Sequence, residues 1–198
     1  MSSPEVERSP QASTVVSAPR VAASHCIRAV SGWTRDGLHS LIALALLAPA
    51  IAWFAQHYRI LDERTVGERC LPYRFYLLHL SEHGEQRGDY VAFSAERMEP
   101  FYPAGTLVAK QVIGVPGDHV LVNANGVWVN EQFWGALQHV KAGGRLWRLG
   151  HRPEEYVRDE RVPPHQLWVM GTHPRSFDSR YWGYVSDEQI VGRAVPLW

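Results

Sequence analysis

The sequence is poor in cysteine and has no excess of charge of either sign. Only 2 of its 198 residues are Cys, which is too few for a disulfide scaffold. The 20 Lys and Arg balance the 20 Asp and Glu, so the chain lacks the positive excess that binds a phosphate backbone, and we expect no nucleic-acid partner. The 10 His are scattered and show no paired ligand spacing with Cys, so we expect no metal and no cofactor.

Long apolar runs are also scarce, with one exception near the N-terminus. Residues 41–55 carry no charge, and adding residues 38–40 gives 18 uncharged residues that reach roughly 27 Å as a helix. This length predicts a transmembrane signal anchor over residues 38–56. A signal peptide cleaved at Ala48-Pro49-Ala50 and a buried core helix are the alternatives. Arginines lie on both sides of the run, so the positive-inside rule leaves the orientation open.

The remainder of the chain divides into a tail and a folded domain. Residues 1–37 begin with a stretch rich in Ser, Ala and Pro, and we expect them to form a disordered N-terminal tail. Residues 57–198 predict a mainly β domain with antiparallel strands, in which Asn125-Gly126 marks a hairpin. An irregular insertion without a clear period interrupts it at residues 133–161. The predicted strands lie at residues 90–93, 107–113, 119–122, 127–129, 167–170 and 190–195.

Two side chains of the folded part are candidates for chemistry. Cys70 is the only Cys there, because Cys26 precedes the apolar run, and a lone thiol is either buried and inert or functional. It falls in an expected turn before an apolar strand that begins near Phe75. Lys110 stands in an apolar β-rich run, and if its face points inward, burial favours a neutral amine that can act as a general base. The alternative places Lys110 on the solvent face of an edge strand.

Several motifs in a fixed order resemble the type I signal peptidases, the serine-lysine peptidases that release signal sequences at the outer membrane face. Residues 110–118, KQVIGVPGD, resemble the lysine box of that family. Residues 176–183, SFDSRYWG, resemble its last box, and residues 190–194, IVGRA, resemble its closing strand. With residues 88–91, 162–163 and 168–171, these motifs cover most of residues 65–198 in the family order. The resemblance implies a signal-peptidase-like antiparallel β-sheet or barrel domain behind one N-terminal transmembrane helix.

The resemblance also implies a role for each matching side chain. Cys70, in place of the serine of the family, would be the nucleophile, and Lys110 would be the general base. Ser176 would orient the lysine amine, Asp178 would support Lys110 or its neighbours, and Arg180 would be structural.

Further expectations concern the oxyanion donors and the substrate contacts. The backbone N–H of Cys70 would be one oxyanion donor. The second donor of ordinary signal peptidases falls at Glu68, which donates only when it is protonated. We expect Pro72, Tyr73 and Phe75 to contact the substrate.

The nucleophile segment points to one branch of the family. Residues 70–76, CLPYRFY, resemble the conjugative-transfer, TraF-type peptidases, whose pattern is Ser, any residue, Pro, any residue, Gly, an apolar residue and Tyr. The segment matches at Pro72 and Tyr76 and departs at Cys70 and Arg74. That branch is associated with joining the cut end of pilin to its own amino terminus. A thioester favours an amine over water more than an oxoester does, so Cys70 predicts cyclisation of pilin.

The resemblance therefore predicts a membrane-anchored endopeptidase that removes signal, leader or C-terminal segments from exported proteins. The expected substrate is prepilin of a conjugative type IV secretion system. We expect a single-pass protein of the bacterial inner membrane with its catalytic domain on the periplasmic side. Its partners would be the exported preprotein, the lipid bilayer and conjugative pilus assembly proteins.

Two other functions compete with this one. In the first, His173 or His165 activates Cys70, as in Cys/His hydrolases. In the second, a catalytically inactive member of the family binds prepilin or scaffolds the pilus machinery. The substitution of Cys for Ser and the presence of Glu68 favour the second, whereas retention of Lys110, Ser176 and Asp178 opposes it.

Overall fold

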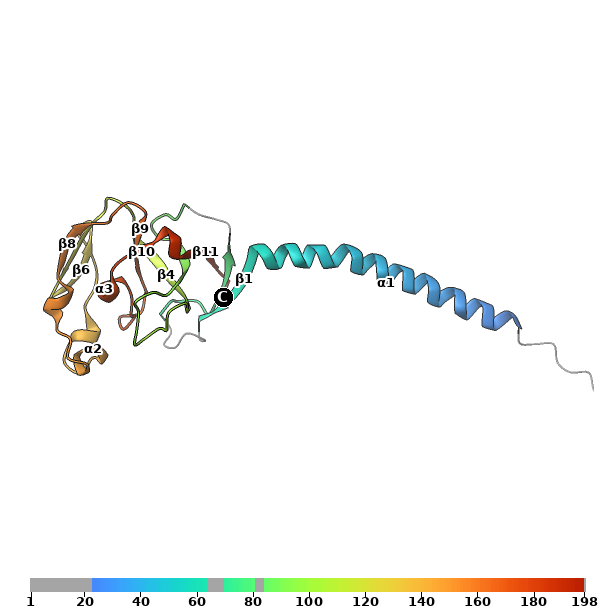
Figure 1. The fold of residues 1–198 in the computed structure, drawn as a ribbon, viewed down its shortest axis with the longest axis horizontal. Coiled ribbons are helices and arrows are strands. Elements are labelled where there is room, and N and C mark those ends of the chain that lie inside the picture. Colours follow the sequence, from blue (N-terminus) through green and yellow to red (C-terminus); the bar gives the residue numbers. More distant parts are fainter. Residues whose placement is uncertain (1–22, 64–69, 81–83, 198) are drawn as a thin grey trace, which may run out of the picture. The chain divides into compact units, whose positions relative to one another are not determined.

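The computed structural model describes residues 23–63, 70–80 and 84–197, and it begins with one long helix. Helix α1 (Ala23–His57) continues through Pro49, and Figure 1 shows it as a coiled ribbon. Residues 23–37 are helical, so the prediction of a disordered tail as far as residue 37 is wrong at its carboxyl end. The Ala-containing sequence from Ala23 onward has no Pro before Pro49 to prevent a helix. Residues 1–22 lie outside the described residues.

The apolar part of α1 is Arg35–His57, with a mean hydropathy of 2.0. Its length and composition are those of a segment that crosses a membrane, and a signal sequence has the same properties. The side chains of residues 35–56 are exposed, including Leu41, Leu46 and Trp53. A buried core helix is therefore not what the structure contains, whereas a retained anchor and a signal sequence both fit α1.

The first sheet has seven strands in the order β1-β2-β11-β3-β4-β9-β10. Each pair of neighbours is antiparallel, as expected for the mainly β domain. Four of the predicted strands belong to this sheet and are confirmed within one residue at each end. The strands are β1 (Tyr58–Asp62), β2 (Phe75–His79), β3 (Tyr90–Ser94), β4 (Leu107–Gly114), β9 (Gln166–Met170), β10 (Val185–Ser186) and β11 (Ile190–Pro196).

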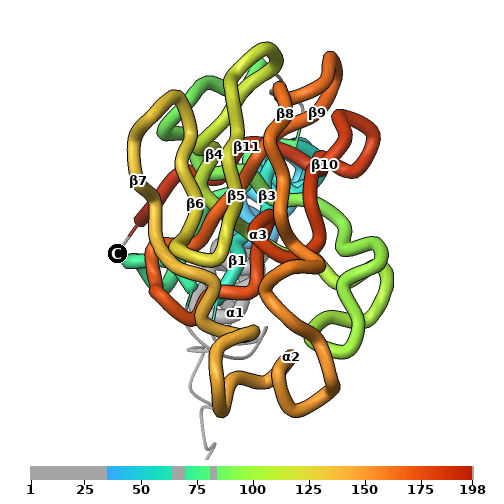
Figure 2. Tube along the Cα trace, turned by 90° about the vertical axis from the view of Figure 1, so that its left-hand side faces the viewer, coloured from blue at the N-terminus to red at the C-terminus, as the bar shows by residue number. Residues whose placement is uncertain are grey.

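The second sheet has four antiparallel strands in the order β7-β6-β5-β8, which Figure 2 shows side by side. These are β5 (His119–Asn123), β6 (Gly126–Val129), β7 (Gln132–Gly135) and β8 (Arg158–Arg161). The predicted irregular segment 133–161 therefore has strands at both ends. Between them lie only short helical turns, Gln138–Val140, α2 (Arg145–Arg148) and Pro153–Tyr156. Helix α3 (Ser179–Trp182) and the turn Asp187–Gln189 flank β10.

The predicted hairpin joins β5 to β6, but Gly126 is the first residue of β6 and not one of the two turn residues. Asn123 pairs with Gly126, so the turn residues are Ala124 and Asn125, and the Asn123 side chain accepts a hydrogen bond from the Asn125 N–H at 2.9 Å. Gly126 has a φ of +150° and lies against β7, where a Cβ would come within 2.6 Å of the Gly135 carbonyl oxygen. Glycine is thus required for the close approach of two strands.

Two apolar clusters make the core. The larger one contains residues of both sheets, such as Val91, Phe93, Val120 and Val129, and it also takes in Trp168. The smaller one consists of Leu61, Leu71, Tyr76, Leu78, Ala92, Ala109 and Ala194 and packs on the first sheet. Burying these side chains stabilises the domain by roughly 1.5–3 kcal/mol for each fully buried large one. Strand β4 contributes to both clusters, so side chains on either of its faces are withdrawn from water.

We predict that Gly126→Ala destabilises the domain by about 2 kcal/mol, because the added methyl group overlaps the backbone of β7. The matched control is Gly117→Ala, since Gly117 has a φ of +89° and no atom within 4 Å of an added Cβ. Only backbone strain of about 1 kcal/mol is expected there. Urea unfolding of the purified full chain in detergent, followed by circular dichroism, measures both losses. Equal losses would show that β7 does not crowd Gly126.

Candidate active site

Cys70 lies in the turn before β2, as the sequence predicted, and the turn is fixed from two sides. The side chain is buried, with 5% exposure. The backbone N–H groups of Cys70 and Leu71 both donate to Oε1 of Glu63, each at 2.6 Å. The Cys70 carbonyl oxygen accepts from the His173 N–H and from the Thr172 hydroxyl, both at 3.2 Å. The backbone that carries the thiol is therefore held at its N–H and at its carbonyl.

Lys110 lies in the middle of β4 with 1% exposure. Strand β4 lies between β3 and β9, and Lys110 pairs with Val91 of β3. Because side chains alternate along a strand, Lys110 shares its face with Val108 and Val112, which belong to the larger apolar cluster. The alternative of a solvent-facing lysine on an edge strand is therefore wrong. The Lys110 amine is therefore withdrawn from solvent, and its role as a general base stays a prediction.

Cys70, Lys110 and Tyr102 line one small cavity of about 10 Å³, together with Leu61, Glu63, Val108 and Ala109. The space is of the order of a single water molecule. The Tyr102 hydroxyl lies 3.8 Å from Cys70 Sγ, and the centre of its ring lies 5.8 Å from Lys110 Nζ. Burial, and next the neighbouring Cys70, raises the pKa of the Tyr102 hydroxyl, so the phenol keeps its proton. It can therefore donate to a thiolate at Cys70.

Ser176 lies beside the backbone of the nucleophile segment. It is fully buried, and its Oγ has no hydrogen-bond partner among the residues that the structure describes. A Cβ at Gly171 would collide with the Ser176 side chain and come within 2.8 Å of the Cys70 carbonyl oxygen. Glycine at position 171 is what lets the serine lie so close to Cys70. No hydrogen bond joins Ser176 to the Lys110 amine among the described residues, so the expected orienting role of Ser176 has no such contact behind it and stays a prediction.

Asp178 and Arg180 form an ion pair that is 0% and 1% exposed at its two side chains. Asp178 accepts two hydrogen bonds from the guanidinium at 2.7 Å each, and its Oδ2 also accepts the Gly171 N–H at 3.0 Å. Arg180 donates in addition to the carbonyl oxygens of Ala136, Pro174 and Ser176 at 3.1, 3.4 and 3.3 Å. Burial alone would lower the pKa of Arg180, but the charge and hydrogen bonds of Asp178 outweigh it and raise that pKa.

Comparison with known proteins identifies the family of the chain. The family described as signal peptidase, peptidase S26, matches residues 34–198. The chain belongs to this family. It is 32% identical over 114 residues to signal peptidase I of Bacillus caldolyticus, a match that covers 54% of this chain and 58% of that protein. It is 32% identical over 118 residues to the probable signal peptidase I-2 of Synechocystis sp., covering 57% of this chain and 48% of that protein.

The chain spans about half the length of the curated signal peptidases that it matches. A crystal structure of a signal peptidase I from Enterococcus faecalis is 29% identical and covers 57% of this chain and 98% of that chain, with a TM-score of 0.35.

The predicted substrate contacts of this family member lie next to Cys70 in the chain. Pro72 and Tyr73 are exposed, Tyr73 by 42%, so both are accessible beside Cys70. Phe75 begins β2, is partly buried, and has the Arg74 guanidinium 4.5 Å from its ring centre. Their part in binding substrate stays a prediction. Glu68, the position of the second oxyanion donor, lies outside the described residues.

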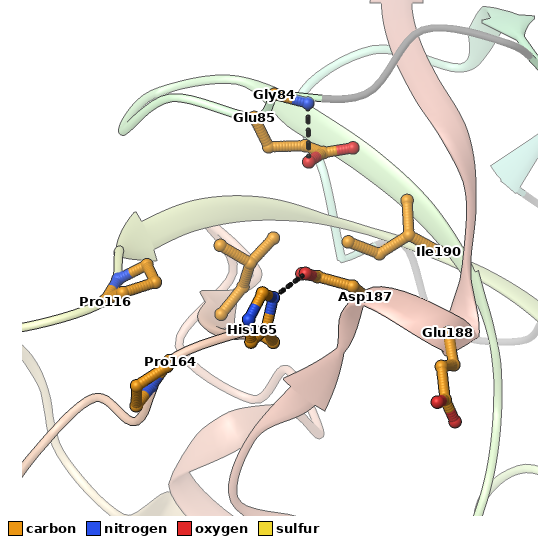
Figure 3. A pocket seen from close by; sticks show the side chains of 9 residues that line it. Gly84, Glu85, Pro116, Pro164, His165, Asp187, Glu188 and Ile190 are labelled. Atoms are coloured by element: carbon orange, nitrogen blue, oxygen red, sulfur yellow. Dashed lines mark hydrogen bonds and ion pairs between the residues drawn. The ribbon is translucent and has the colours of Figure 1, made fainter.

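Neither histidine of the competing Cys/His hypothesis lines the cavity that contains Cys70 and Lys110. His165 lines a separate cavity of about 680 Å³, where its Nδ1 lies 3.0 Å from Oδ2 of Asp187 (Figure 3). Cys70 is not among the lining residues of that cavity. His173 is exposed, and its Nδ1 accepts the Arg175 N–H at 3.2 Å. Lys110, by contrast, lines the same cavity as Cys70.

Sequence reasoning missed Tyr102, Glu63 and Gly171 as parts of this site. Tyr102 stands in the loop between β3 and β4, and Glu63 directly follows β1, where neither belongs to a recognisable motif. Only Gly171, at the end of the segment that resembles the approach to the last family box, carried a signal in the sequence. The described residues contain no cluster of three or more His, Cys, Asp or Glu side chains that could hold a metal ion.

We predict that Asp178→Ala destabilises the domain by about 3–5 kcal/mol, because it leaves the Arg180 charge buried without its carboxylate. Asp62→Ala is the matched control, since Asp62 pairs with Arg74 at 3.0 Å where both side chains are partly exposed. Its loss should stay below about 1 kcal/mol. Adding Arg180→Met to Asp178→Ala should restore part of the stability. Thermal unfolding of the full chain in detergent gives the melting temperatures of the two single variants and of the double variant. Similar melting temperatures for Asp178→Ala and Asp62→Ala would contradict the prediction.

Proposed function

We propose that this signal peptidase family member is a membrane-anchored endopeptidase in which Cys70 is the nucleophile and Lys110 the general base. The single observation that carries the proposal is that the two side chains line one buried cavity. Lys110 is 1% exposed in an apolar strand. Burying a charged side chain there costs free energy, so packing alone does not explain a lysine at this position. A base that must be neutral at the start of the reaction explains its presence.

The proposed reaction begins when the Cys70 thiol gives its proton to the Lys110 amine. The sulfur forms a bond to the scissile carbonyl carbon, and the electron pair of the C=O bond moves to oxygen. When the C=O bond forms again, the C–N bond breaks and the leaving amine takes the proton from Lys110. This leaves a thioester on Cys70. Water or an amine then attacks the thioester, gives a proton to Lys110, and the sulfur leaves and regains that proton.

The choice of the second nucleophile decides the product. A thiol needs less activation than an alcohol because its pKa in water is about 8.5. Its thioester prefers an amine to water, so a Cys70 enzyme is suited to joining a cut chain to an amino terminus. Together with the resemblance of residues 70–76 to the conjugative-transfer branch, this favours prepilin of a type IV secretion system as the substrate and cyclic pilin as the product.

The proposed location in the cell is based on the apolar part of helix α1 and on the family resemblance. Helix α1 contains an apolar part of sufficient length to anchor the chain in the bacterial inner membrane, with the catalytic domain on the periplasmic side. The substrate would then be cut at the membrane surface, after small residues. Exported preproteins, the bilayer and pilus assembly proteins are the partners of this proposal.

We predict that Cys70→Ala abolishes processing of the candidate prepilin in cells and that Lys110→Ala lowers its rate by about 10²–10⁴-fold, the usual contribution of a general base. The matched control is Lys141→Ala, since Lys110 and Lys141 are the only two lysines and Lys141 is exposed. Mass spectrometry of pilin from cells that carry each variant measures processing.

Other results of this experiment would support the competing functions. If His173→Ala or His165→Ala abolishes processing while Lys110→Ala does not, the enzyme is a Cys/His hydrolase. If Cys70→Ala leaves processing unchanged, the chain binds or scaffolds prepilin without cutting it.

We predict further that wild-type enzyme yields cyclic pilin, with a mass lower by one water than the linear product. Cys70→Ser should shift the product toward the linear form, because its oxoester discriminates less between an amine and water. Mass spectrometry of purified prepilin incubated with each enzyme gives the ratio of the two products. Only linear pilin from the wild-type enzyme would overturn the cyclisation step while leaving endopeptidase activity intact.

A further inference from the structure

The carboxylate of Glu63 occupies an unusual position next to the nucleophile. Its Oε1 accepts the N–H groups of two consecutive residues, Cys70 and Leu71, at 2.6 Å each. Glu63 is 5% exposed and lines the same cavity as Cys70 and Lys110. Two successive N–H groups that converge on one oxygen form a backbone site for a negatively charged oxygen.

Such a site is what the proposed reaction needs at this place. When Cys70 Sγ attacks a carbonyl carbon, the negative charge develops on an oxygen held close to the backbone of the nucleophile. The N–H of Cys70 is the expected first donor. The N–H of Leu71 points to the same oxygen as the N–H of Cys70 does, so it supplies a second donor that needs no side chain at Glu68.

Resting on the proposed function, we infer that the N–H groups of Cys70 and Leu71 form the oxyanion pocket and that the Glu63 carboxylate closes it until substrate arrives. One oxygen at 2.6 Å from both nitrogens leaves no room for a second acceptor. The substrate carbonyl must therefore displace Glu63. Hydrogen bonds to a carboxylate are stronger than those to a neutral carbonyl, so the closed form predominates before the reaction.

This arrangement lowers the apparent affinity for any ligand whose oxygen uses the pocket. The apparent dissociation constant is the intrinsic constant divided by the fraction of molecules in which the pocket is open. After removal of the carboxylate, the Cys70 carbonyl is still held by the His173 N–H and the Thr172 hydroxyl, so the inference requires that both donors stay in place and the pocket is permanently open. Binding of an oxyanion should then become tighter, whereas loss of a merely structural clamp would make it weaker.

A peptide aldehyde that ends in alaninal is the probe. The Cys70 sulfur forms a bond to the aldehyde carbon, the electron pair of the C=O bond moves to oxygen, and the thiol proton ends on Lys110 or on that oxygen. The product is a thiohemiacetal whose oxygen lies in the pocket. Its inhibition constant is measured with the full-length wild type, Glu63→Ala and Glu63→Gln in detergent. Asp62→Ala is the matched control, because it removes the neighbouring carboxylate, which pairs with Arg74 instead.

We expect Glu63→Ala to bind the aldehyde at least about tenfold more tightly than wild type. This factor follows if the pocket of the wild type is open in about a tenth or less of the molecules. Glu63→Gln should be intermediate, because its neutral amide oxygen competes less strongly, and Asp62→Ala should match wild type. Methyl methanethiosulfonate, which has no carbonyl, measures thiol reactivity alone. Its rate with Cys70 should change by less than about threefold, a much smaller effect than that expected for the opened pocket.

The possible failures are distinguishable. If the wild type forms a Cys70-dependent adduct and both Glu63 variants bind it equally or more weakly while retaining their melting temperatures, Glu63 is a structural clamp and this inference alone is overturned. A thiosulfonate rate that rises as much as the aldehyde affinity overturns it too, because the effect would then lie in the thiol. If Cys70→Ala binds the aldehyde as wild type does, or neither wild type nor Glu63→Ala binds it, both the inference and the proposed function are overturned.

Discussion

The buried ion pair between Asp178 and Arg180 organises the segment that bonds the backbone of Cys70. Arg180 binds three carbonyl oxygens around the pair, and Asp178 reaches back to the N–H of Gly171. The segment so held provides the donors that bind the Cys70 carbonyl. A charged pair with 0% and 1% exposure is tolerable only because nearly every hydrogen-bonding atom is satisfied. The ion pair thus connects the last family motif to the backbone of Cys70.

The two side chains proposed to react, Cys70 and Lys110, are held by their backbone surroundings. Lys110 belongs to β4, a central strand paired on both sides, so its position is fixed by the ladders to β3 and β9. Cys70 is held through its N–H by Glu63 and through its carbonyl by the β9–α3 segment. Tyr102 lies near both. Charges and dipoles interact more strongly in a small buried cavity of this kind than in water.

Most strands were predictable from local composition, and the exceptions have a physical cause. The β-branched and apolar runs of β3, β4, β5, β6, β9 and β11 mark strands without knowledge of the fold. Strand β8 is Arg158-Asp159-Glu160-Arg161, whose charges hide it in the sequence, and it forms a strand because it pairs with β5. Strand β1 likewise owes its extended form to its pairing with β2. Pairing partners far along the chain decide such segments.

The sequence by itself determined the β class of the domain and the apolar helix, and its motifs in a fixed order singled out Cys70 and Lys110 as candidates. These features depend on local composition or on contiguous patterns. Only the tertiary structure decided that Lys110 is buried, that Tyr102 contacts the thiol, that Gly171 makes room for Ser176, and that Glu63 binds the N–H groups of Cys70 and Leu71. These contacts join loops and strands that lie far apart in the sequence, so no local sequence pattern predicts them. They form only when the strands of the sheet pair in register.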